Sequence, residues 1–410
     1  MKEYRTAKIA CYLSCISMSV AANISPLLFL TFRELYGISY TLLGLLVLVN
    51  FCTQLGVDLI FSFFSHRLPL GICVRATPVL SVVGLVVFAL APSLFPGAEY
   101  ACLLVGTFLF SIAAGLGEVL TSPVIAAIPS ENPEAEMSRY HSSYAWGTVA
   151  VVVIGTLFLE LFDNSLWQVL VLMLTLIPLS SAVCFLRAKL PPLETAENAG
   201  GTGGVFRNAG VLLCVLAIFM GGAAECTMSQ WASGYLEMAL GIPKMWGDIF
   251  GVAMFALALG LGRTLYAKYG KNTFNILILG SFSAAVCYLV AALSPLPVVG
   301  LIACALTGLC TAMLWPGNLI VSSEHYPSAG VALYALMAAG GDLGASVAPQ
   351  LVGSLTDAVA KNPSPFAALF GEGLASEQVG MRVGILMAAL FPLLGTAVLL
   401  VLRHYFKRHT

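Results

Sequence analysis

Residues 165–187 read SLWQVLVLMLTLIPLSSAVCFLR, residues 190–204 read LPPLETAENAGGTGG, and residues 208–236 read NAGVLLCVLAIFMGGAAECTMSQWASGYL. The outer two stretches are apolar and each is long enough to cross a bilayer as a helix. The stretch between them is polar and rich in glycine and proline, which is typical of a flexible linker. The sequence therefore predicts two membrane-embedded halves, residues 1–190 and 208–410, joined by a cytoplasmic linker over residues 191–207.

The composition of the whole chain agrees with a lipid environment. Of the 410 residues, 59% are hydrophobic and only 10% are charged, whereas a soluble domain is about 25% charged. So few charges cannot coat a soluble protein of this length. The net charge of −1 without a basic patch excludes a nucleic-acid-binding protein, and the composition also excludes a disordered chain. The eleven cysteines lie mostly in apolar runs without a CxxC pair, so we predict no disulfide, metal site or cofactor.

Apolar runs of membrane-crossing length recur along the chain and predict twelve transmembrane helices, six in each pseudo-symmetric half. The fourth and tenth runs echo each other, because each contains a proline, Pro123 or Pro316, that follows a run of small residues. This pattern predicts an all-α membrane protein made of two parallel repeats. The predicted spans are residues 8–32, 40–64, 72–92, 99–128, 141–162, 165–187, 208–236, 246–268, 273–293, 297–321, 330–356 and 380–403.

The distribution of cations gives the predicted orientation. With the N-terminus inside, fifteen of the nineteen Lys and Arg residues fall on the cytoplasmic side, as the positive-inside rule requires. We therefore expect a multi-pass protein of the plasma membrane with both termini in the cytoplasm. A signal peptide cleaved near residues 20–22 is the alternative, but it would leave eleven spans and conflict with a cytoplasmic C-terminus.

Acidic residues within the predicted spans are the main candidates for function, because a charge there costs at least about 2.5 kcal/mol to insert. Glu118 lies among glycines in Ala114-Gly-Leu-Gly-Glu118 and is followed by Pro123, and no Lys or Arg lies deep enough to be its obvious partner. We expect Glu118 to gain and lose a proton as access alternates. The alternative is a permanently protonated carboxyl that only joins two helices.

Glu225 lies mid-span in the first helix of the second half and is followed by Gln230 and Trp231. A carboxylate, an amide and an indole ring together suit a polyol, because they offer acceptors, donors and a flat apolar face to a sugar ring. We therefore expect these three side chains to line one vestibule. The alternative is that they only hold helices together.

Other polar residues within the spans have weaker functional interpretations. Asp342 lies among small residues, where either a ligand role or an interhelical bond fits. Asp58 is nearer the cytoplasmic end of its span, which favours a gate or a packing role. Asn23, Asn50 and Gln54 are cheaper polar groups on helices expected to face the cavity, and an interhelical hydrogen bond is an equal alternative for each.

Four short segments carry a resemblance to a known family. They are Gly115-Leu-Gly-Glu118 with Pro123, Arg139-Tyr-His141-Ser-Ser-Tyr144-Ala-Trp146-Gly147, Gly222-Ala-Ala-Glu225 with Trp231 and Tyr235, and Trp315-Pro316 with Gly340, Gly341 and Pro349. In these segments, and in its twelve-span layout, the chain resembles the major facilitator superfamily and, within it, the fucose–galactose–hexose proton symporter family. The resemblance places Glu118 on the fourth-helix acid that family members use for proton coupling or sugar binding.

The chain departs from the family pattern at two positions. It has Ser122 where the fucose transporter pattern has an asparagine, and Asn23 where that pattern has an acid. The resemblance therefore implies a related carrier rather than a fucose carrier. A fifth-helix glycine–proline antiporter signature is missing, which argues against drug antiport.

These observations together predict a secondary transporter that moves a small polar solute, a monosaccharide in the first instance, by proton-coupled alternating access. We expect Glu118 and Glu225 to carry the protons, and the protein to act as a monomer in the lipid bilayer rather than as an enzyme. A carrier of a metabolite or drug, or an uncoupled facilitator, is the alternative. The predicted solute site comprises Asn23, Asn50, Gln54, Glu118, Tyr144, Glu225, Gln230, Trp231, Trp315, Asn318 and Asp342. The predicted cytoplasmic gate comprises Asp58, Arg67, Arg75, Arg139 and Arg263, with ion pairs to Glu131, Glu134, Glu136 or Glu324. Ordinary positive-inside anchoring is an equal alternative for the four arginines.

Overall fold

The computed structural model describes residues 3–64, 67–130, 133–192, 208–269, 272–326, 330–371 and 373–409. Within these ranges the chain forms helices and connecting segments without a strand, so the predicted all-α fold is confirmed. Eleven helical segments in the described ranges are long and apolar enough to cross a membrane. The predicted eleventh span corresponds to α15 (Gly330–Lys361), which is not among those eleven, so the count of twelve stays a prediction.

The helices form two compact units, which are described separately. Unit 1 takes in the described residues of Met1–Gly37 and Val49–Asn198, and unit 2 those of Ile38–Leu48 and Ala199–Thr410. From residue 193 onward, the predicted linker lies outside the described residues.

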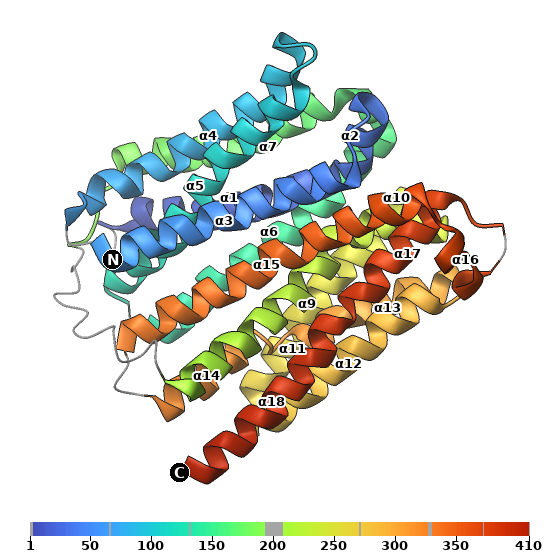
Figure 1. Cartoon of the computed structure of the whole chain (residues 1–410). Coiled ribbons are helices and arrows are strands. Elements are labelled where there is room, and N and C mark those ends of the chain that lie inside the picture. Colours follow the sequence, from blue (N-terminus) through green and yellow to red (C-terminus); the bar gives the residue numbers. More distant parts are fainter. Residues whose placement is uncertain are drawn as a thin grey trace. The chain divides into compact units, whose positions relative to one another are not determined.

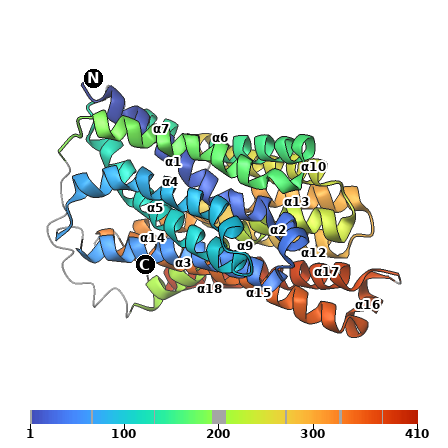
Figure 2. The same cartoon turned by 90° about the horizontal axis from the view of Figure 1, so that it is seen from above.

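Unit 1 is built from the helices of the first half of the chain. In Figure 1 they run from blue at α1 to green at α7, and in Figure 2 α6 and α7 lie beside α1, with which both are in contact. They are α1 (Arg5–Leu27), α2 (Phe29–Tyr36), α3 (Tyr40–Phe64), of which the part from Val49 belongs here, α4 (Leu70–Leu94), α5 (Glu99–Ala127), α6 (Pro133–Phe162), the 3-10 turn η2 (Asn164–Leu166) and α7 (Trp167–Arg187).

Helices α4 and α5 pack more closely than any large side chain at the crossing would allow. A β-carbon added to Gly84 would overlap the backbone nitrogen of Phe110, and one added to Gly106 would lie 2.6 Å from the Cα of Phe88. The rings of Phe88 and Phe110 fill the space beside this crossing, with their centroids 5.6 Å apart. Small residues at a helix crossing are a usual way to gain packing contacts in lipid, where no hydrophobic force drives the helices together.

Unit 2 contains the helices of the second half of the chain, together with the first residues of α3. Three of its predicted spans are interrupted: α13 is followed by α14, α17 by α18, and a π-helical segment, η3, precedes α11. The helices are α9 (Ala209–Leu240), α10 (Lys244–Trp246), η3 (Gly247–Ala253), α11 (Met254–Tyr269), α12 (Thr273–Leu293), α13 (Pro297–Thr311), α14 (Pro316–His325), α15, α16 (Ser364–Phe370), α17 (Ser376–Ala388) and α18 (Leu390–His409).

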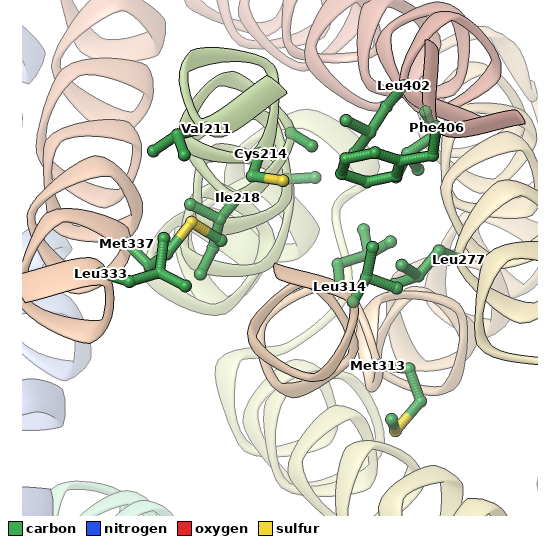
Figure 3. Close-up of a cluster of buried hydrophobic side chains, with 14 residues drawn as sticks. Val211, Cys214, Ile218, Leu277, Met313, Leu314, Leu333, Met337, Leu402 and Phe406 are labelled. Atoms are coloured by element: carbon green, nitrogen blue, oxygen red, sulfur yellow. The ribbon is translucent and has the colours of Figure 1, made fainter. Parts of the chain in front are cut away.

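The core of unit 2 lies where α9, α12, α15 and α18 meet the interrupted span α13–α14. Figure 3 shows Cys214 and Ile218 of α9 in one apolar cluster with Leu314, Met337 and Phe406. These side chains are almost entirely buried, and in lipid it is their van der Waals packing that holds the helices together. This cluster holds the interrupted span in place beside α9.

The start of α3 is held within unit 2 by acids from α15 and α17. Asp357 Oδ2 accepts hydrogen bonds from the backbone N–H and the hydroxyl of Thr41, both at 2.6 Å, and Asp357 Oδ1 accepts one from the Tyr40 N–H at 3.3 Å. The Tyr40 hydroxyl donates to Glu377 at 3.3 Å. The first N–H groups of a helix have no partner within the helix, so Asp357 supplies from another element the acceptors that α3 lacks.

The close crossing of α4 and α5 leads to a stability prediction. Gly84→Ala should lower the free energy of unfolding by about 1–3 kcal/mol, because its new methyl group forces the two backbones apart. Gly56→Ala is the matched control, since a β-carbon there meets nothing within 4 Å and alanine favours a helix by about 0.5–1 kcal/mol. Thermal unfolding of the detergent-solubilised protein measures both, and equal melting temperatures for the two variants would contradict the packing argument.

Candidate functional site

A break in the tenth predicted span forms the centre of the candidate site in unit 2. Helix α13 ends at Thr311 and α14 begins at Pro316. Proline has no N–H, so the carbonyl of Ala312, four residues before Pro316, receives no helical hydrogen bond from it. Arg263 of α11 fills this place, since its Nε donates to the Ala312 carbonyl at 3.1 Å.

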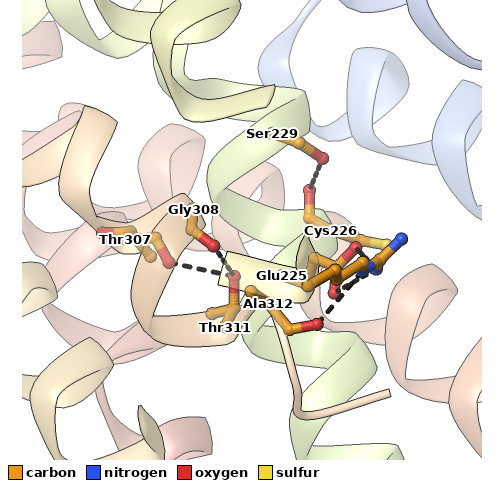
Figure 4. A network of polar contacts seen from close by, with 8 residues as sticks. Glu225, Cys226, Ser229, Thr307, Gly308, Thr311 and Ala312 are labelled. Atoms are coloured by element: carbon orange, nitrogen blue, oxygen red, sulfur yellow. Dashed lines mark hydrogen bonds and ion pairs between the residues drawn. The ribbon is translucent and has the colours of Figure 1, made fainter. Parts of the chain in front are cut away.

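Arg263 also forms an ion pair with the mid-span acid of α9. Its Nη2 lies 3.2 Å from Oε1 and 3.5 Å from Oε2 of Glu225. Figure 4 shows the Glu225 carboxylate beside the Ala312 carbonyl. The Glu225 side chain is 16% exposed and that of Arg263 is 43% exposed. One guanidinium thus bridges an acid, which needs a counter-charge, and a carbonyl that proline leaves without a donor.

This pairing differs from the predicted one. Arg263 was expected at a cytoplasmic gate with an acid from a cytoplasmic segment, whereas its guanidinium contacts Glu225 instead. The arginine side chain reaches both Glu225 and the Ala312 carbonyl, so it joins α11 to α9 and to the break. The sequence did contain one signal: Pro316 predicts an open carbonyl at Ala312, and an open carbonyl in a membrane span needs a donor.

Glycines let α15 and the interrupted span approach α9 beside this ion pair. A β-carbon on Gly222 would overlap the carbonyl of Gly341, and one on Gly341 would overlap the ring of Trp315. Trp315 is half-buried and precedes α14, and Asp342 is buried next to Gly341 on α15. Three of the predicted solute-site residues, Glu225, Trp315 and Asp342, therefore lie on elements that meet at one crossing.

The structure does not bring Gln230 and Trp231 together with Glu225, which fits the alternative that these side chains hold helices together. At about 100° per residue, Gln230 lies roughly 140° and Trp231 roughly 120° around α9 from Glu225. The Trp231 side chain is completely buried, and its indole N–H donates to the Pro349 carbonyl at 3.0 Å. Its ring packs against Tyr40 with the centroids 6.1 Å apart. Trp231 therefore fastens α9 to α15.

Asn318 lies in the first turn of α14 and is almost fully buried. Its side-chain amide donates to the Leu314 carbonyl at 2.6 Å, which gives the break a second donor from a side chain. Among the described residues, its amide oxygen has no hydrogen-bond partner. Asn318 thus supports the break, and the structure shows no access from solvent to its side chain.

Glu118 occupies a different environment, in the middle of α5 of unit 1. Its side chain is exposed, and it makes no hydrogen bond or ion pair with any residue that the structure describes. A carboxylate within a spanning helix is costly unless a cation or water compensates it. Unlike Glu225, Glu118 has no cation beside it among the described residues.

The amide side chains of unit 1 form interhelical hydrogen bonds. Asn50 Oδ1 accepts from Ser111 of α5 at 2.7 Å and from Gln54, one turn along α3, at 3.0 Å. Asn23 donates to the Ser19 carbonyl at 2.8 Å and to Thr148 of α6 at 3.4 Å. Asn23 and Asn50 are both buried. These contacts fit the alternative that Asn23 and Asn50 form interhelical hydrogen bonds. Gln54 is half-buried.

Tyr144 differs from the amides because it is 38% exposed on α6. Tyr144 lies on α6, whereas Glu118 lies on α5. The role of Tyr144 in binding a solute stays a prediction.

The predicted cytoplasmic gate is only partly covered by the described residues. Glu131 lies outside them, and nothing can be said of the Glu134 side chain. The remaining predicted residues are placed as follows: Arg75 donates to the carbonyls of Gly71 and Ala188, Arg67, Arg139 and Glu324 are exposed, and Asp58 is half-buried.

Glu136 pairs with a residue that the sequence did not single out. Lys8 Nζ lies 2.6 Å from Oε2 of Glu136, and the Tyr12 hydroxyl donates to Oε1 at 2.6 Å. The hydrogen bonds from Lys8 and Tyr12 hold the pKa of Glu136 below its usual value, and the charge of Arg139 acts in the same direction. This contact joins the start of α6 to α1 within unit 1.

The lowered pKa of Glu136 predicts a pH dependence of stability. A carboxyl whose pKa is lower in the folded state stabilises that state above its unfolded pKa of about 4.5, and the stabilisation is lost as the pH falls through the folded value. Glu136→Gln should therefore melt below the wild type at pH 7, and the difference should shrink as the pH falls below about 4.5 and through the lower folded pKa. A melting-temperature difference that does not shrink as the pH is taken well below 4.5 would contradict this assignment.

Metal binding has no support in the described ranges, where no group of three or more His, Cys, Asp or Glu side chains could hold an ion.

The comparisons with known proteins agree with the helical fold. The sequence profile of the Major Facilitator Superfamily matches residues 10–349. Among solved structures, a bacterial homologue of the human lysosomal transporter Spinster, in an inward-facing and occupied conformation, has a TM-score of 0.77 at 14% identity, covering 100% of this chain and 98% of that chain. A D-xylose–proton symporter has a TM-score of 0.72 at 16% identity, with 94% and 96% covered. The E. coli fucose:proton symporter has a TM-score of 0.61 at 15% identity, with 98% and 99% covered. No curated protein sequence matches.

Proposed function

Because this chain belongs to the Major Facilitator Superfamily, we propose that it is a secondary active transporter that moves a small polar solute, a monosaccharide or a close derivative, together with protons. The single observation that carries the coupling is Glu118, an exposed mid-helix carboxyl without a partner among the described residues. Family membership supports a transporter. The fold similarity to two sugar–proton symporters supports the substrate class and the coupling ion.

The proposed mechanism is alternating access of a midplane site. An uncompensated carboxylate opposes closure of a drying cavity, because it would lose its water without gaining a counter-charge. Protonation of Glu118 removes that cost, so closure is favoured once a proton is bound. The proton leaves when the other side opens, and the cycle links the movement of solute to that of protons.

Glu225 plays a different part from Glu118 in this proposal. Its charge is already balanced by Arg263 at 3.2 Å, so it does not oppose closure in the same way. A proton on Glu225 would release Arg263, which could then bind another acceptor. Protonation of Glu225 is therefore linked to binding of the solute, whereas protonation of Glu118 is linked to closure of the site.

A non-sugar solute is the second candidate, and one observation favours it. The burial of Trp231 removes the aromatic face that was expected to bind a sugar ring beside Glu225. The half-buried Trp315 and the exposed Tyr144 are the remaining aromatic groups of the predicted solute site.

As a carrier, the protein is expected to work as a monomer in the plasma membrane with both termini in the cytoplasm.

Uptake into proteoliposomes tests the proposal. With a panel of labelled monosaccharides, an inward proton gradient should raise the uptake of at least one of them, and Glu118→Gln should lower the gradient-driven part roughly tenfold or more. Glu99→Gln is the matched control, since Glu99 lies on the same helix but at its first turn, where it binds the Gly97 N–H at 2.9 Å.

Three outcomes separate the parts of the proposal. Uptake that is unchanged by the gradient in wild type and in Glu118→Gln would overturn proton coupling. A panel in which no sugar moves would overturn the monosaccharide class. Equal losses in Glu118→Gln and Glu99→Gln would show that the effect is not specific to the mid-helix carboxyl.

A further inference from the structure

Arg263 has hydrogen-bond donors that the described structure leaves unused. A guanidinium carries five N–H groups. The Nε donor is bound to the Ala312 carbonyl and the Nη2 group to Glu225. No residue in the described ranges accepts from Nη1, and 43% of the side chain is exposed. Nη1 is therefore available to a ligand, on a side chain that is not enclosed by the described residues.

Closure of the site would leave these donors without water. An unsatisfied donor in a dry interior costs about 1–3 kcal/mol, and more for a charged group. The break itself offers no replacement, because the Ala312 carbonyl is already bound to Nε and the Leu314 carbonyl to Asn318. A solute that occupies the site must therefore bring its own acceptor to Arg263.

We propose that the solute carries a carboxylate, which binds the free side of the Arg263 guanidinium through Nη1 and Nη2. This inference rests on the proposed transport function and names the substrate class: a carboxylated polyol, such as a sugar acid, rather than a neutral sugar. Two parallel N–H···O bonds to a carboxylate match the geometry of a guanidinium, and they are about twice as strong as bonds to a neutral hydroxyl.

Charge balance couples this carboxylate to a proton. With Glu225 ionised, one arginine would face two carboxylates, and like charges that share a site favour protonation of one of them. Binding of the solute anion with one proton on Glu225 leaves the site with the same net charge as before. No bond is formed or broken other than the transfer of this proton.

Other titratable groups near Glu225 are few in the described ranges. Cys226 is its neighbour on α9, and α15 contributes the buried Asp342 beside Gly341. From α12, the Tyr288 hydroxyl donates to the Ala224 carbonyl at 2.7 Å.

The test compares acids with their neutral counterparts. D-Glucuronate, D-galacturonate and D-gluconate, with D-glucose and D-galactose as neutral probes, are assayed for binding by calorimetry on the purified full-length protein and for uptake into proteoliposomes. At least one acid should bind roughly tenfold or more tighter than its neutral counterpart. Arg263→Gln should remove this preference, and Arg187→Gln, which changes an exposed arginine at the end of α7, should preserve it.

Two further variants separate recognition from folding. Glu225→Gln should keep the binding of the acid but lose its pH dependence, whereas in the wild type affinity should fall as the pH rises from 5.5 to 8. Because Arg263→Gln leaves Glu225 without a counter-charge, the double variant Arg263→Gln, Glu225→Gln provides a neutral site, and it too should lack the preference for acids. Monodispersity in detergent shows that each variant is folded.

The results distinguish this inference from the proposed function. If neutral sugars are bound and driven by a proton gradient as well as the acids are, the carboxylate inference is overturned and the proposed function stands. If neither acids nor neutral sugars bind to the folded wild type, both are overturned. A preference for acids that persists in Arg263→Gln would also contradict the role of Arg263.

Discussion

A hydrogen bond that Pro316 cannot donate shapes the centre of unit 2. In the hydrocarbon region, each backbone carbonyl needs a donor from within the protein, and the Ala312 carbonyl has lost its helical one. Arg263 supplies the donor at 3.1 Å. A cation at this depth needs a counter-charge, which Glu225 provides. Pro316, Arg263 and Glu225 therefore depend on one another, because removing any one of them leaves another polar group uncompensated.

The two units deal with buried polarity in opposite ways. In unit 2 the acid at the middle of α9 is paired, and Cys226 and Asp342 lie near it. In unit 1 the Asn50 side chain is satisfied by Gln54 and Ser111, and the mid-helix acid Glu118 makes no hydrogen bond or ion pair with any described residue. In the proposed transporter, the paired Glu225 and Arg263 recognise a charged solute. The unpaired Glu118 responds to protons.

The sequence predicted the helices well, because membrane spans follow directly from apolar length. The predicted span 273–293 coincides with α12, and 40–64 coincides with α3. Pro316 and Pro123 look alike in the sequence, yet only the first lies at a break, since α5 continues through Pro123. Local sequence does not state whether a neighbouring helix can supply the missing donor.

The site residues were predicted less well, for reasons of geometry. Glu225, Gln230 and Trp231 are close in sequence, but the helical turn sends them to different faces of α9. The partner of Glu225 is 38 positions away on α11, and only the packing of α9, α11 and the interrupted span brings the two together. Asp357 at the start of α3 was missed for the same reason, because its partners Tyr40 and Thr41 are more than 300 residues away.

The central claim is that solute and protons cross together, and the most direct measurement follows the protons. A pH-sensitive dye is enclosed in proteoliposomes, without an imposed gradient, and a transported solute is added outside. The account predicts that the lumen becomes more acidic as solute enters, in proportion to the amount taken up. Solute accumulation without any change in the internal pH would contradict it.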